Sequence, residues 1–397
     1  MTILEKMLNL GRKIIPQPIF NFFQPAYHFL LGALAVFWYG FPSRKLKVIG
    51  VTGTNGKSTI VYLTANILEK AEYAVASISS IQFKIKDNIW LNDLKMTMPG
   101  RFEIQKFLRR AVKAGCQYAV LEVTSEGIKQ HRHRFIGFDT AVLANLTPEH
   151  IESHGGFENY KKAKGGLFQA LKKSGKAIVN LDDPNAEYFL RFPAGKKWGY
   201  AIRPPRKEGV NVQNLIRAEN CKANKNGVSF TADDANFNLN LLGEFNIYNS
   251  LAAIAVGIAE KISLGKIKLA LEEVRGIPGR LEIITKKPFT VIIDYAHTPD
   301  ALEKVYQTIK KSFGGRIIGV LGAAGGGRDK WKRPEMGKIA DKYLDKIIIT
   351  NEDPYDEEPQ AIISGITAGI KKKPVEKIID RKKAIRRALK IARKGDV

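Results

Sequence analysis

The stretch VIGVTGTNGKSTI, residues 48–60, decides the fold, because it reads as a strand, a glycine-containing loop and the start of a helix. A Walker A loop requires Gly, four residues and then Gly-Lys-Ser/Thr. Gly56, Lys57 and Ser58 meet the second half of that pattern, but Val51 stands where its first glycine belongs. Backbone N–H groups at the start of a helix attract anions, because the helix dipole is positive there. The stretch therefore predicts a phosphate-binding loop with a variant glycine pattern.

Apolar runs of strand length recur along the chain and alternate with segments of helical periodicity. After the run in 48–60 they fall within residues 116–125, 138–150 and 175–184, and again within 290–297, 315–330 and 345–359. Strands that alternate with helices predict a parallel sheet, with functional groups at the carboxyl ends of the strands. Residues 200–240 instead alternate apolar and polar positions between turn residues, which predicts a β-hairpin insert.

These segments predict an α/β fold class with two units that meet near residue 276. The first, residues 46–276, is a central P-loop parallel-sheet domain of the ATPase type, and it carries the β-hairpin insert. The second, residues 277–397, is a smaller Rossmann-like α/β domain. Residues 1–45 form a short apolar N-terminal segment ahead of both.

The N-terminal segment holds the strongest apolar run. No Lys, Arg, Asp or Glu occurs from Ile14 to Ser43, and residues 26–41 read AYHFLLGALAVFWYGF. A membrane-spanning helix needs about 20 apolar residues, and this run is shorter. We therefore expect a helix that is buried or lies on a membrane surface, rather than one that crosses the bilayer.

Composition narrows the class of protein. The chain has 397 residues and 44% hydrophobic content, enough for more than one core. Its two cysteines argue against a disulfide framework and fit a reducing cytoplasm. The net charge of +25 suits anionic nucleotides or an anionic membrane surface. The basic residues are dispersed without interleaved aromatic residues, which argues against nucleic acid as the partner.

Several polar residues stand where they could carry phosphate chemistry. Lys57 would neutralise phosphate charge and the Ser58 hydroxyl would bind Mg²⁺. Glu122 ends a strand, where a carboxylate could complete the metal site. His150 could bind a metal, and Lys164 could do so if it were carbamylated. For each residue an ordinary surface or turn role is the alternative.

The second unit offers its own candidates. Asp294 at a strand end could accept hydrogen bonds from ribose hydroxyls. Arg280 and Arg328 could bind phosphate or carboxylate groups through two N–H donors each. His131 and His133 lack an acidic or cysteine partner in the sequence nearby, which favours a polar loop over a metal site.

Segments along the chain resemble the Mur ligase family, and most of all its MurE branch, the UDP-N-acetylmuramoyl-tripeptide synthetases. The resemblance runs from about Leu46 to the end of the chain and covers segments that occur in family order. They are TGTNGKST, MTMPG, EVTSEGIKQHR, FDTAVLANLTPEHIESHG, YKKAKGGLF, NLDDP, LLGEFNIYNSLAA, GIPGRLE, DYAHTPDAL, GGGRDKWKRPEMG and TNEDPYDEEP.

The resemblance implies an ATP-dependent ligase of peptidoglycan precursor synthesis, with ATP and Mg²⁺ as cofactors. ATP would phosphorylate a carboxylate of an acceptor like UDP-MurNAc-L-Ala-D-Glu, and an amino-acid amine would attack the acyl phosphate. The implied catalytic residues are Lys57, Glu122, His150 and Lys164, and the implied metal ligands are Ser58, Glu122, His150 and carbamylated Lys164. The implied ATP-binding residues are Gly53, Thr54, Asn55, Gly56, Lys57, Ser58, Thr59, Asn249, Arg280 and Asp294. The implied substrate-binding residues are Thr97, Thr124, Gln130, Arg132, Arg328, Glu352, Asp353 and Tyr355.

The chain departs from the family pattern in several places. Residues 1–45 stand in place of the family's UDP-binding domain. Met98 and Glu126 replace a Thr and a His that are usual in the family, and Tyr355 replaces the Arg of diaminopimelate enzymes. Loss of that guanidinium removes a bidentate partner for a distal carboxylate, which puts diaminopimelate in doubt. The chain stops at Val397, where the family continues, so either a fragment or a gene that ends there fits.

Other interpretations stay open on the sequence alone. The shortened N-terminus also fits a ligase that acts on a lipid-linked muramoyl acceptor, and a folylpolyglutamate-like acceptor is a further alternative. A non-catalytic ATP-binding scaffold is the alternative from another class, and retained Lys57, Glu122, His150 and Lys164 argue against it. We expect a cytoplasmic monomer that works on a muramoyl-peptide nucleotide and an amino acid. Peripheral contact through residues 19–41 would place it at the inner face of the membrane.

Overall fold

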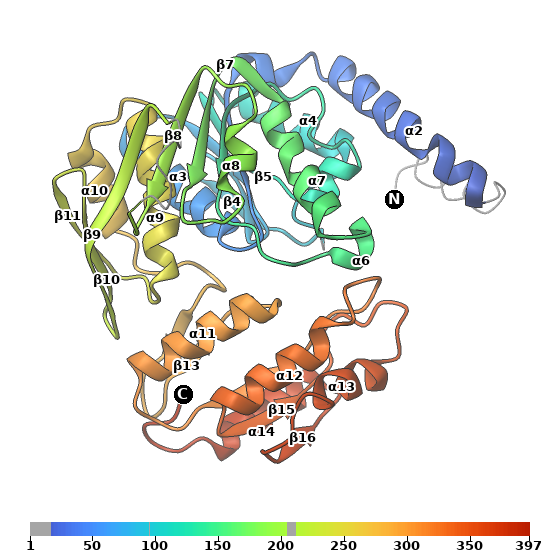
Figure 1. Ribbon diagram of the computed structural model, residues 1–397, viewed down its shortest axis with the longest axis vertical. Helices are drawn as coiled ribbons and strands as arrows, with labels where there is room; N and C mark the ends of the chain where they lie inside the picture. Colours follow the sequence, from blue (N-terminus) through green and yellow to red (C-terminus); the bar gives the residue numbers. More distant parts are fainter. Residues whose placement is uncertain (1–16, 95, 205–211) are drawn as a thin grey trace.

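The computed structural model describes residues 17–94, 96–204 and 212–397, with side chains from Ala26 onward. The N-terminal segment of residues 1–45 is thus described from Gln17, and part of the 200–240 insert lies outside the described residues. In Figure 1 a large sheet with helices on both faces stands beside a smaller α/β unit formed by the C-terminal part of the chain. The predicted α/β class, with its P-loop domain and smaller second domain, is confirmed.

The large sheet has eleven strands in the order β11-β10-β9-β8-β7-β6-β1-β5-β2-β3-β4. Its central neighbours, from β9 to β2 in that order, run parallel. Those strands are β1 (Lys47–Thr52), β2 (Val75–Ile78), β5 (Tyr118–Glu122), β6 (Phe138–Leu143), β7 (Leu171–Asn180), β8 (Lys196–Ala201) and β9 (Asn214–Asn224). The chain passes from β1 to β2 on one side of β1 and from β5 to β6 on the other side, so the strand order reverses at β1, and ligands bind at such a switch point in α/β sheets.

Antiparallel strands extend the sheet at both edges. At one edge β10 (Gly227–Ala232) and β11 (Ala235–Leu239) continue from β9, and at the other β3 (Gln82–Ile85) and β4 (Asn88–Leu91) continue from β2. The expected hairpin insert is therefore part of the main sheet. Alternation along the sequence predicted the strands, but only the pairing of β8 with β9 joins them to the sheet.

Helices cover both faces of this sheet. One face carries α3 (Lys57–Lys70), α9 (Phe245–Ala259) and α10 (Leu264–Glu272), and the other carries α4 (Arg101–Lys113), α5 (Ser125–Lys129), α7 (Phe157–Gln169) and α8 (Ala186–Leu190). The α9 helix is apolar around most of its circumference, and nearly all of its side chains are buried. A helix with that pattern fits only in a core, so α9 is the central helix of its layer.

The C-terminal unit has its own core and sheet. Strands β14 (Ile318–Leu321), β15 (Lys346–Ile349) and β16 (Val375–Lys377) are parallel, and β12 (Glu282–Thr285) pairs with β13 (Val291–Ile293) in antiparallel fashion. Their helices are α11 (Pro299–Ser312), α12 (Lys332–Tyr343), α13 (Pro359–Thr367) and α14 (Arg381–Ile391). Thr298 caps α11 by accepting a hydrogen bond from Ala301 N at 3.2 Å, so the DYAHTP segment ends at a fixed helix start.

The N-terminal apolar run forms the helix α2 (Gln17–Trp38), followed by the short 3₁₀ helix η1 (Pro42–Lys45). Figure 1 shows α2 beside α4, at the outer edge of the large unit. Within the part of the chain that the structure describes, no helix has the length and apolar character that crossing a bilayer requires.

Candidate active site

The phosphate loop joins β1 to α3 and is shaped by two glycines with positive φ. Gly53 has φ 149°, and a Cβ there would lie 2.8 Å from Ala144 Cβ. Gly56 has φ 85° at the N-cap of α3, and a Cβ there would lie 2.3 Å from Asn249 Oδ1. Neither position accepts a side chain without displacing a neighbour. The loop thus needs glycine at 53 and 56, which accounts for its departure from the standard pattern.

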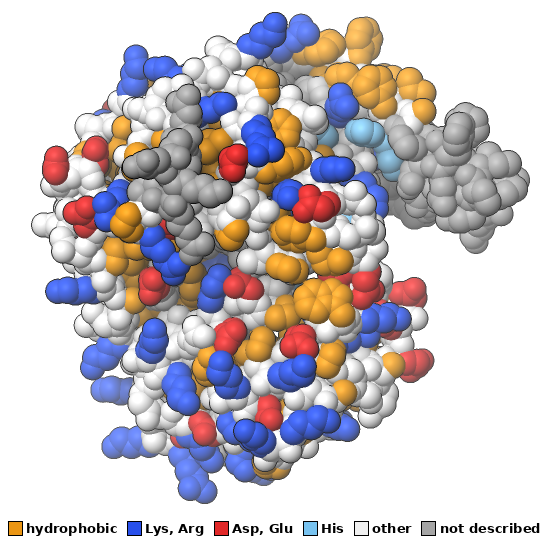
Figure 2. Space-filling model, viewed as in Figure 1, with side chains coloured by type: hydrophobic (Ala, Val, Ile, Leu, Met, Phe, Trp, Pro, Cys, Tyr) orange, Lys and Arg blue, Asp and Glu red, His pale blue; other side chains and the backbone are white. Residues whose placement is uncertain are grey.

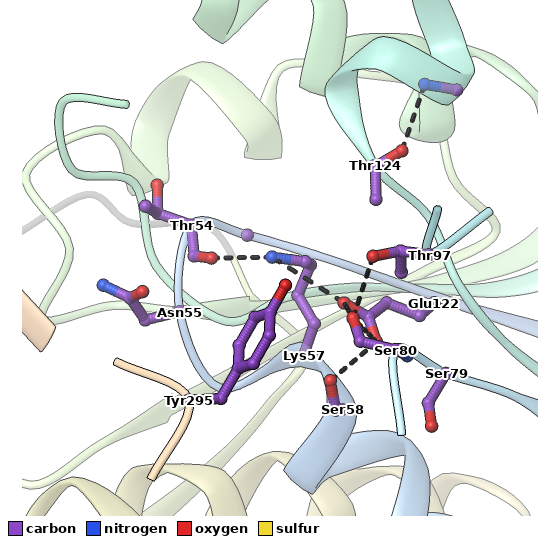
Figure 3. A network of polar contacts seen from close by, with 12 residues as sticks. Thr54, Asn55, Lys57, Ser58, Ser79, Ser80, Thr97, Glu122, Thr124 and Tyr295 are labelled. Atoms are coloured by element: carbon purple, nitrogen blue, oxygen red, sulfur yellow. Dashed lines mark hydrogen bonds and ion pairs between the residues drawn. The ribbon is translucent and has the colours of Figure 1, made fainter. Parts of the chain in front are cut away.

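A polar network gathers on Glu122 at the end of β5. Ser58 Oγ donates to Glu122 Oε2 at 2.7 Å, and Ser80 N donates to the same oxygen at 2.9 Å. Lys57 Nζ lies 3.9 Å from Glu122 Oε1 and donates to Thr54 O at 2.6 Å. Figure 3 shows Lys57 and Ser58 of α3, Ser80 after β2 and Glu122 at the end of β5 converging on one point. A buried carboxylate, a lysine and a hydroxyl thus meet beside a helix N-terminus, as anion and metal binding requires.

Lys164 reaches the same loop from α7. It is 2% exposed, and its Nζ donates to Gly53 O at 2.6 Å. Burial lowers the pKa of Lys164 well below its usual range, and the nearby Lys57 cation lowers it further. The neutral amine is favoured as a result. A neutral amine is the form that adds carbon dioxide to become a carbamate.

His150 and Glu149 occupy the turn after β6. His150 has φ 55° and precedes the short helix α6 (Ile151–His154). Burial lowers the pKa of His150 to about 4, so its imidazole is neutral at pH 7. Glu149 Oε1 lies 2.9 Å from His297 Nε2 of the C-terminal unit. Burial alone would raise the pKa of Glu149, but the contact with His297 outweighs it and holds the pKa well below its usual range.

The C-terminal unit closes over the phosphate loop through several polar contacts. Arg280 Nη2 donates to Ser58 Oγ at 2.9 Å, and the Arg280 guanidinium lies 4.7 Å from the centre of the Tyr295 ring. Asn55 Nδ2 donates to Asp300 Oδ2 at 2.9 Å. Asp294 accepts from Leu281 N and from Ala296 N, each at 2.7 Å. Burial raises the pKa of Asp294, whose immediate contacts shape the backbone of its own unit.

A second set of contacts links the glycine loop of residues 322–330 to the large unit. Asp329 is 1% exposed and accepts from Ile151 N at 3.1 Å and from Glu152 N at 3.0 Å. Glu152 Oε1 in turn accepts from Lys330 N at 2.9 Å. Each unit thus supplies a carboxylate that binds backbone N–H groups of the other.

A cavity of about 1240 Å³ lies between the two units. Most of the site residues expected from the sequence line it: Thr54, Asn55, Gly56, Lys57, Ser58, Thr59, Thr97, Glu122, Thr124, His150, Lys164, Asn249, Arg280, Asp294, Arg328, Glu352, Asp353 and Tyr355. Gly53 contributes its carbonyl to Lys164 behind the loop. Residues that lie far apart in the sequence thus face one space large enough for a nucleotide and a second substrate.

Gln130 and Arg132 do not line the cavity. Arg132 Nη2 donates to Gln130 Oε1 at 2.7 Å, and Arg132 Nη1 donates to Met98 O. Thr97 Oγ1 shares a hydrogen bond of 2.8 Å with Ser80 Oγ, and Thr124 caps α5 by accepting from Gly127 N at 3.0 Å. Arg132 thus binds the backbone behind the lining residue Thr97, and it supports that part of the wall from outside.

The 352–355 loop packs against the glycine loop. Gly325 N donates to Asp353 O at 2.8 Å, and the Arg328 guanidinium lies 5.7 Å from the centre of the Tyr355 ring. A Cβ at Gly326 would lie 2.8 Å from the Tyr355 ring. The two loops therefore form one wall of the cavity, with Glu352 and Asp353 on it.

Sequence reasoning missed four residues at this site. Ser80 contacts Glu122, and His297 contacts Glu149. The other two are Glu149 itself and buried Lys332, which both line the cavity. Glu149 directly precedes His150, and His297 follows Asp294 by three residues. Each could have been predicted as a polar neighbour of a candidate site residue. Ser80 carries no signal in the sequence, because only the parallel pairing of β2 with β5 brings it to Glu122.

The oxygen ligands suit a magnesium ion that is shared with phosphate. Over residues 17–94, 96–204 and 212–397, no group of three or more His, Cys, Asp or Glu side chains is arranged to hold a metal. Magnesium in nucleotide sites uses one or two carboxylates and completes its shell with phosphate oxygens and water. Ser58 and Glu122 supply such a partial set, so the residues present fit the ion.

Comparisons with known proteins agree with this geometry. The family model described as Mur ligase middle domain matches residues 51–257, and the model described as Mur ligase, glutamate ligase domain matches residues 279–397. A UDP-N-acetylmuramyl-tripeptide synthetase of Roseiflexus sp. (strain RS-1) is 38% identical over 392 residues, which cover 92% of this chain and 75% of the relative. A UDP-N-acetylmuramoyl-L-alanyl-D-glutamate–2,6-diaminopimelate ligase of Syntrophomonas wolfei is 39% identical over 379 residues, with the same coverage of 92% and 75%.

Solved structures share the fold. A UDP-N-acetylmuramoyl-L-alanyl-D-glutamate–2,6-diaminopimelate ligase has a TM-score of 0.59 and 29% identity, over 88% of this chain and 72% of that one. Folylpolyglutamate synthase of Mycobacterium tuberculosis, complexed with ADP and AMPPCP, has a TM-score of 0.72 at 18% identity, over 91% and 88%. The second likeness concerns the fold alone. By sequence and by fold, the chain belongs to the Mur ligase family, whose members are ATP-dependent ligases that form amide bonds.

Proposed function

We propose that this protein adds an amino acid to a muramoyl dipeptide, of the UDP-MurNAc-L-Ala-D-Glu kind, during peptidoglycan precursor synthesis. The observation that carries the proposal is the Ser58–Glu122 pair at the phosphate loop with Arg280 closed over it. Two relatives, each matched over 92% of this chain, have names that describe ligases of this kind.

The residues would divide the work of an acyl-phosphate mechanism as follows. The loop of residues 53–59, with Asn249, Arg280 and Asp294, would bind ATP, and Lys57 would neutralise charge on the transferred phosphoryl group. Ser58 and Glu122 would hold Mg²⁺, which supplies charge neutralisation at the phosphates when bound. His150, neutral at pH 7, and carbamylated Lys164 would add ligands for a second metal ion. The acyl phosphate forms when the substrate carboxylate attacks the terminal phosphorus and ADP leaves.

The second half of the reaction needs an amine held beside the acyl phosphate. The amine attacks the acyl carbon, a tetrahedral intermediate forms, and inorganic phosphate leaves as the amide bond closes. Arg328, Glu352, Asp353 and Tyr355 line the cavity on the C-terminal side, where we place the incoming amino acid. Thr97 and Thr124 line the cavity from the large unit, where we place the muramoyl peptide, with Gln130 and Arg132 supporting that wall. Holding both substrates in one cavity would lower the barrier through proximity and orientation.

Product mass tests the proposal directly. The full-length protein is incubated with ATP, Mg²⁺, UDP-MurNAc-L-Ala-D-Glu and single amino acids, and the product is analysed by mass spectrometry. We expect a mass gain of one amino-acid residue with one member of the panel, and no product from Lys57→Ala. Turnover on a lipid-linked muramoyl or folate acceptor alone would replace the proposed acceptor. Absence of ATP turnover with every acceptor would favour a scaffold.

We infer a cytoplasmic monomer as the working form. ATP is a cytoplasmic substrate, and the thiols of Cys116 and Cys221 are free, as in a reducing compartment. Light scattering after size exclusion, at the concentration used for the activity assay, tests the monomer.

A further inference from the structure

The α2 helix presents a continuous apolar stripe to solvent. Phe37 and Trp38 are 76% and 74% exposed, and Phe29, Leu30 and Leu34 are 42–66% exposed. Their spacing of three, four and seven or eight residues puts all five on one side of the helix. Figure 2 shows hydrophobic side chains gathered where Figure 1 places α2. Contiguous exposed apolar surface of this kind marks an interaction site.

The opposite side of α2 is packed against the protein. His28, Ala35 and Val36 are buried, and Phe29 contacts Phe135 with ring centroids 5.2 Å apart. A Cβ at Gly32 would lie 3.4 Å from the Phe135 ring, so the helix backbone approaches that ring closely. The helix is therefore held in place mainly by its buried side, and Phe29, at the edge of the exposed stripe, takes part in that attachment.

The charge distribution around α2 favours an anionic partner. No Asp or Glu occurs from Lys6 to Leu68, whereas exposed Arg44 and Lys45 follow the helix. Arg134, beside Phe135, is also exposed. A second copy of this chain docked through the stripe would bring these like charges toward one another. An anionic lipid surface would instead accept both the stripe and the cations.

The aromatic residues at the end of the helix fit the same partner. Trp38 ends the stripe and Tyr39 follows it, ahead of the basic residues, and the Arg44 guanidinium lies 4.3 Å from the centre of the Phe41 ring. Trp and Tyr are enriched where apolar acyl chains meet polar headgroups. Along the chain, the apolar stripe is thus followed by aromatic residues and then by cations. The same order leads from the acyl chains of a bilayer to its anionic headgroups.

We propose that α2 docks the protein on the surface of an anionic lipid bilayer. Leu30, Leu34, Phe37 and Trp38 enter the boundary between headgroups and acyl chains, and Arg44 and Lys45 contact lipid phosphates. The helix lies in the plane of the surface, as its packing against Phe135 requires. Because this docking is independent of the proposed ligase reaction, either can fail without the other.

Vesicle flotation tests the docking. The full-length protein is mixed with vesicles of phosphatidylcholine containing about 30% phosphatidylglycerol, or of phosphatidylcholine alone, and floated through a density gradient. We expect binding to the anionic vesicles that weakens with salt. Leu34→Asp/Phe37→Asp should lower the partition coefficient at least about tenfold, and Arg44→Glu/Lys45→Glu should remove most of the preference for anionic lipid.

Leu91→Asp is the matched control, because Leu91 is 75% exposed on β4, away from α2. Thermal unfolding verifies that every variant folds. Quenching of Trp38 fluorescence by brominated lipid, absent in Trp38→Phe, locates the contact. No flotation, or equal loss from the Leu91→Asp variant, would refute the docking. A concentration-dependent dimer that Leu34→Asp/Phe37→Asp abolishes, in place of vesicle binding, would show that a second copy covers the stripe.

Discussion

Ser58 Oγ donates a 2.7 Å hydrogen bond to Glu122 Oε2 and accepts a 2.9 Å hydrogen bond from Arg280 Nη2. The first contact joins the phosphate loop to the neighbouring parallel strand, and the second joins the large unit to the C-terminal unit. One hydroxyl therefore reports on both the proposed metal site and the contact between the two units. Its surroundings allow sharp tests of the site.

Glu122→Gln removes the carboxylate charge with little change in size. We expect turnover to fall at least about 100-fold, because a neutral amide would hold Mg²⁺ more weakly and the negative charge of the phosphates would be less well neutralised. The Mg²⁺ concentration for half-maximal rate should rise as well. ADP release measures both quantities. The exposed helix variant Glu103→Gln is the control, and a Glu122→Gln enzyme with unchanged Mg²⁺ dependence would contradict the metal role.

Gly56→Ala places a methyl group where a Cβ would lie 2.3 Å from Asn249 Oδ1, at a φ of 85°. A non-glycine residue in this backbone region costs about 1–3 kcal/mol, before any clash is counted. We expect a lower midpoint in urea and weaker nucleotide binding, measured by fluorescence of a labelled ATP analogue.

Two further variants separate strain from clash at this position. Adding Asn249→Ala to Gly56→Ala should restore part of the stability, because the clash goes but the backbone strain stays. Gly100→Ala should be close to neutral, since open space surrounds its Cβ position. Equal effects of Gly56→Ala and Gly100→Ala would show that the loop does not need glycine.

Lys164→Met separates stability from catalysis. Burial lowers the pKa of Lys164, so an apolar side chain removes a disfavoured charge, while loss of the hydrogen bond to Gly53 O opposes that gain. We therefore expect only a small change in melting temperature. Turnover should fall at least about 100-fold if the carbamate binds metal.

Labelled bicarbonate tests the modification itself. Wild-type protein incubated with ¹³C-bicarbonate should show a carbamate resonance that Lys164→Met lacks. Identical spectra for the two proteins would remove carbamylation from the mechanism, whatever the activity of the variant.

The buried His133 side chain should make the folded protein less stable in mild acid. Burial lowers the pKa of His133 to about 4, while the unfolded chain binds its proton near the ordinary value of 6.5. Between these values the unfolded state binds more protons, so stability is complete above pH 6.5 and falls toward pH 4. At pH 5 the loss is roughly 2 kcal/mol for this one group.

Urea unfolding at pH 7 and pH 5 measures that loss. His133→Leu should reduce the difference in unfolding free energy between the two pH values, because the group that titrates is gone. The exposed lysine variant Lys106→Leu should leave the difference unchanged. If the His133→Leu protein loses as much stability as wild type, another group causes the acid sensitivity.

The sequence by itself determined the phosphate loop, the alternation of strands and helices and the strand ends that carry polar residues. It did so because glycine loops, helix starts and apolar periodicity are local properties, set by neighbours a few residues apart. Lys57, Ser58 and Glu122 are predicted on those grounds, and in the structure Glu122 lies within 2.7 Å of Ser58 and 3.9 Å of Lys57. Gln130 and Arg132 were expected at the acceptor, yet they lie behind the cavity wall.

Only the tertiary structure decided which of these local features meet. Ser80 reaches Glu122 because β2 pairs with β5, and β9–β11 join the main sheet because β8 pairs with β9. The contact of Glu149 with His297 joins the two units across 148 residues of chain, counted as 297 minus 149. The outward stripe of α2 likewise depends on which side packs against Phe135. Strand order and helix packing are set by burial over the whole chain, and no local pattern encodes them.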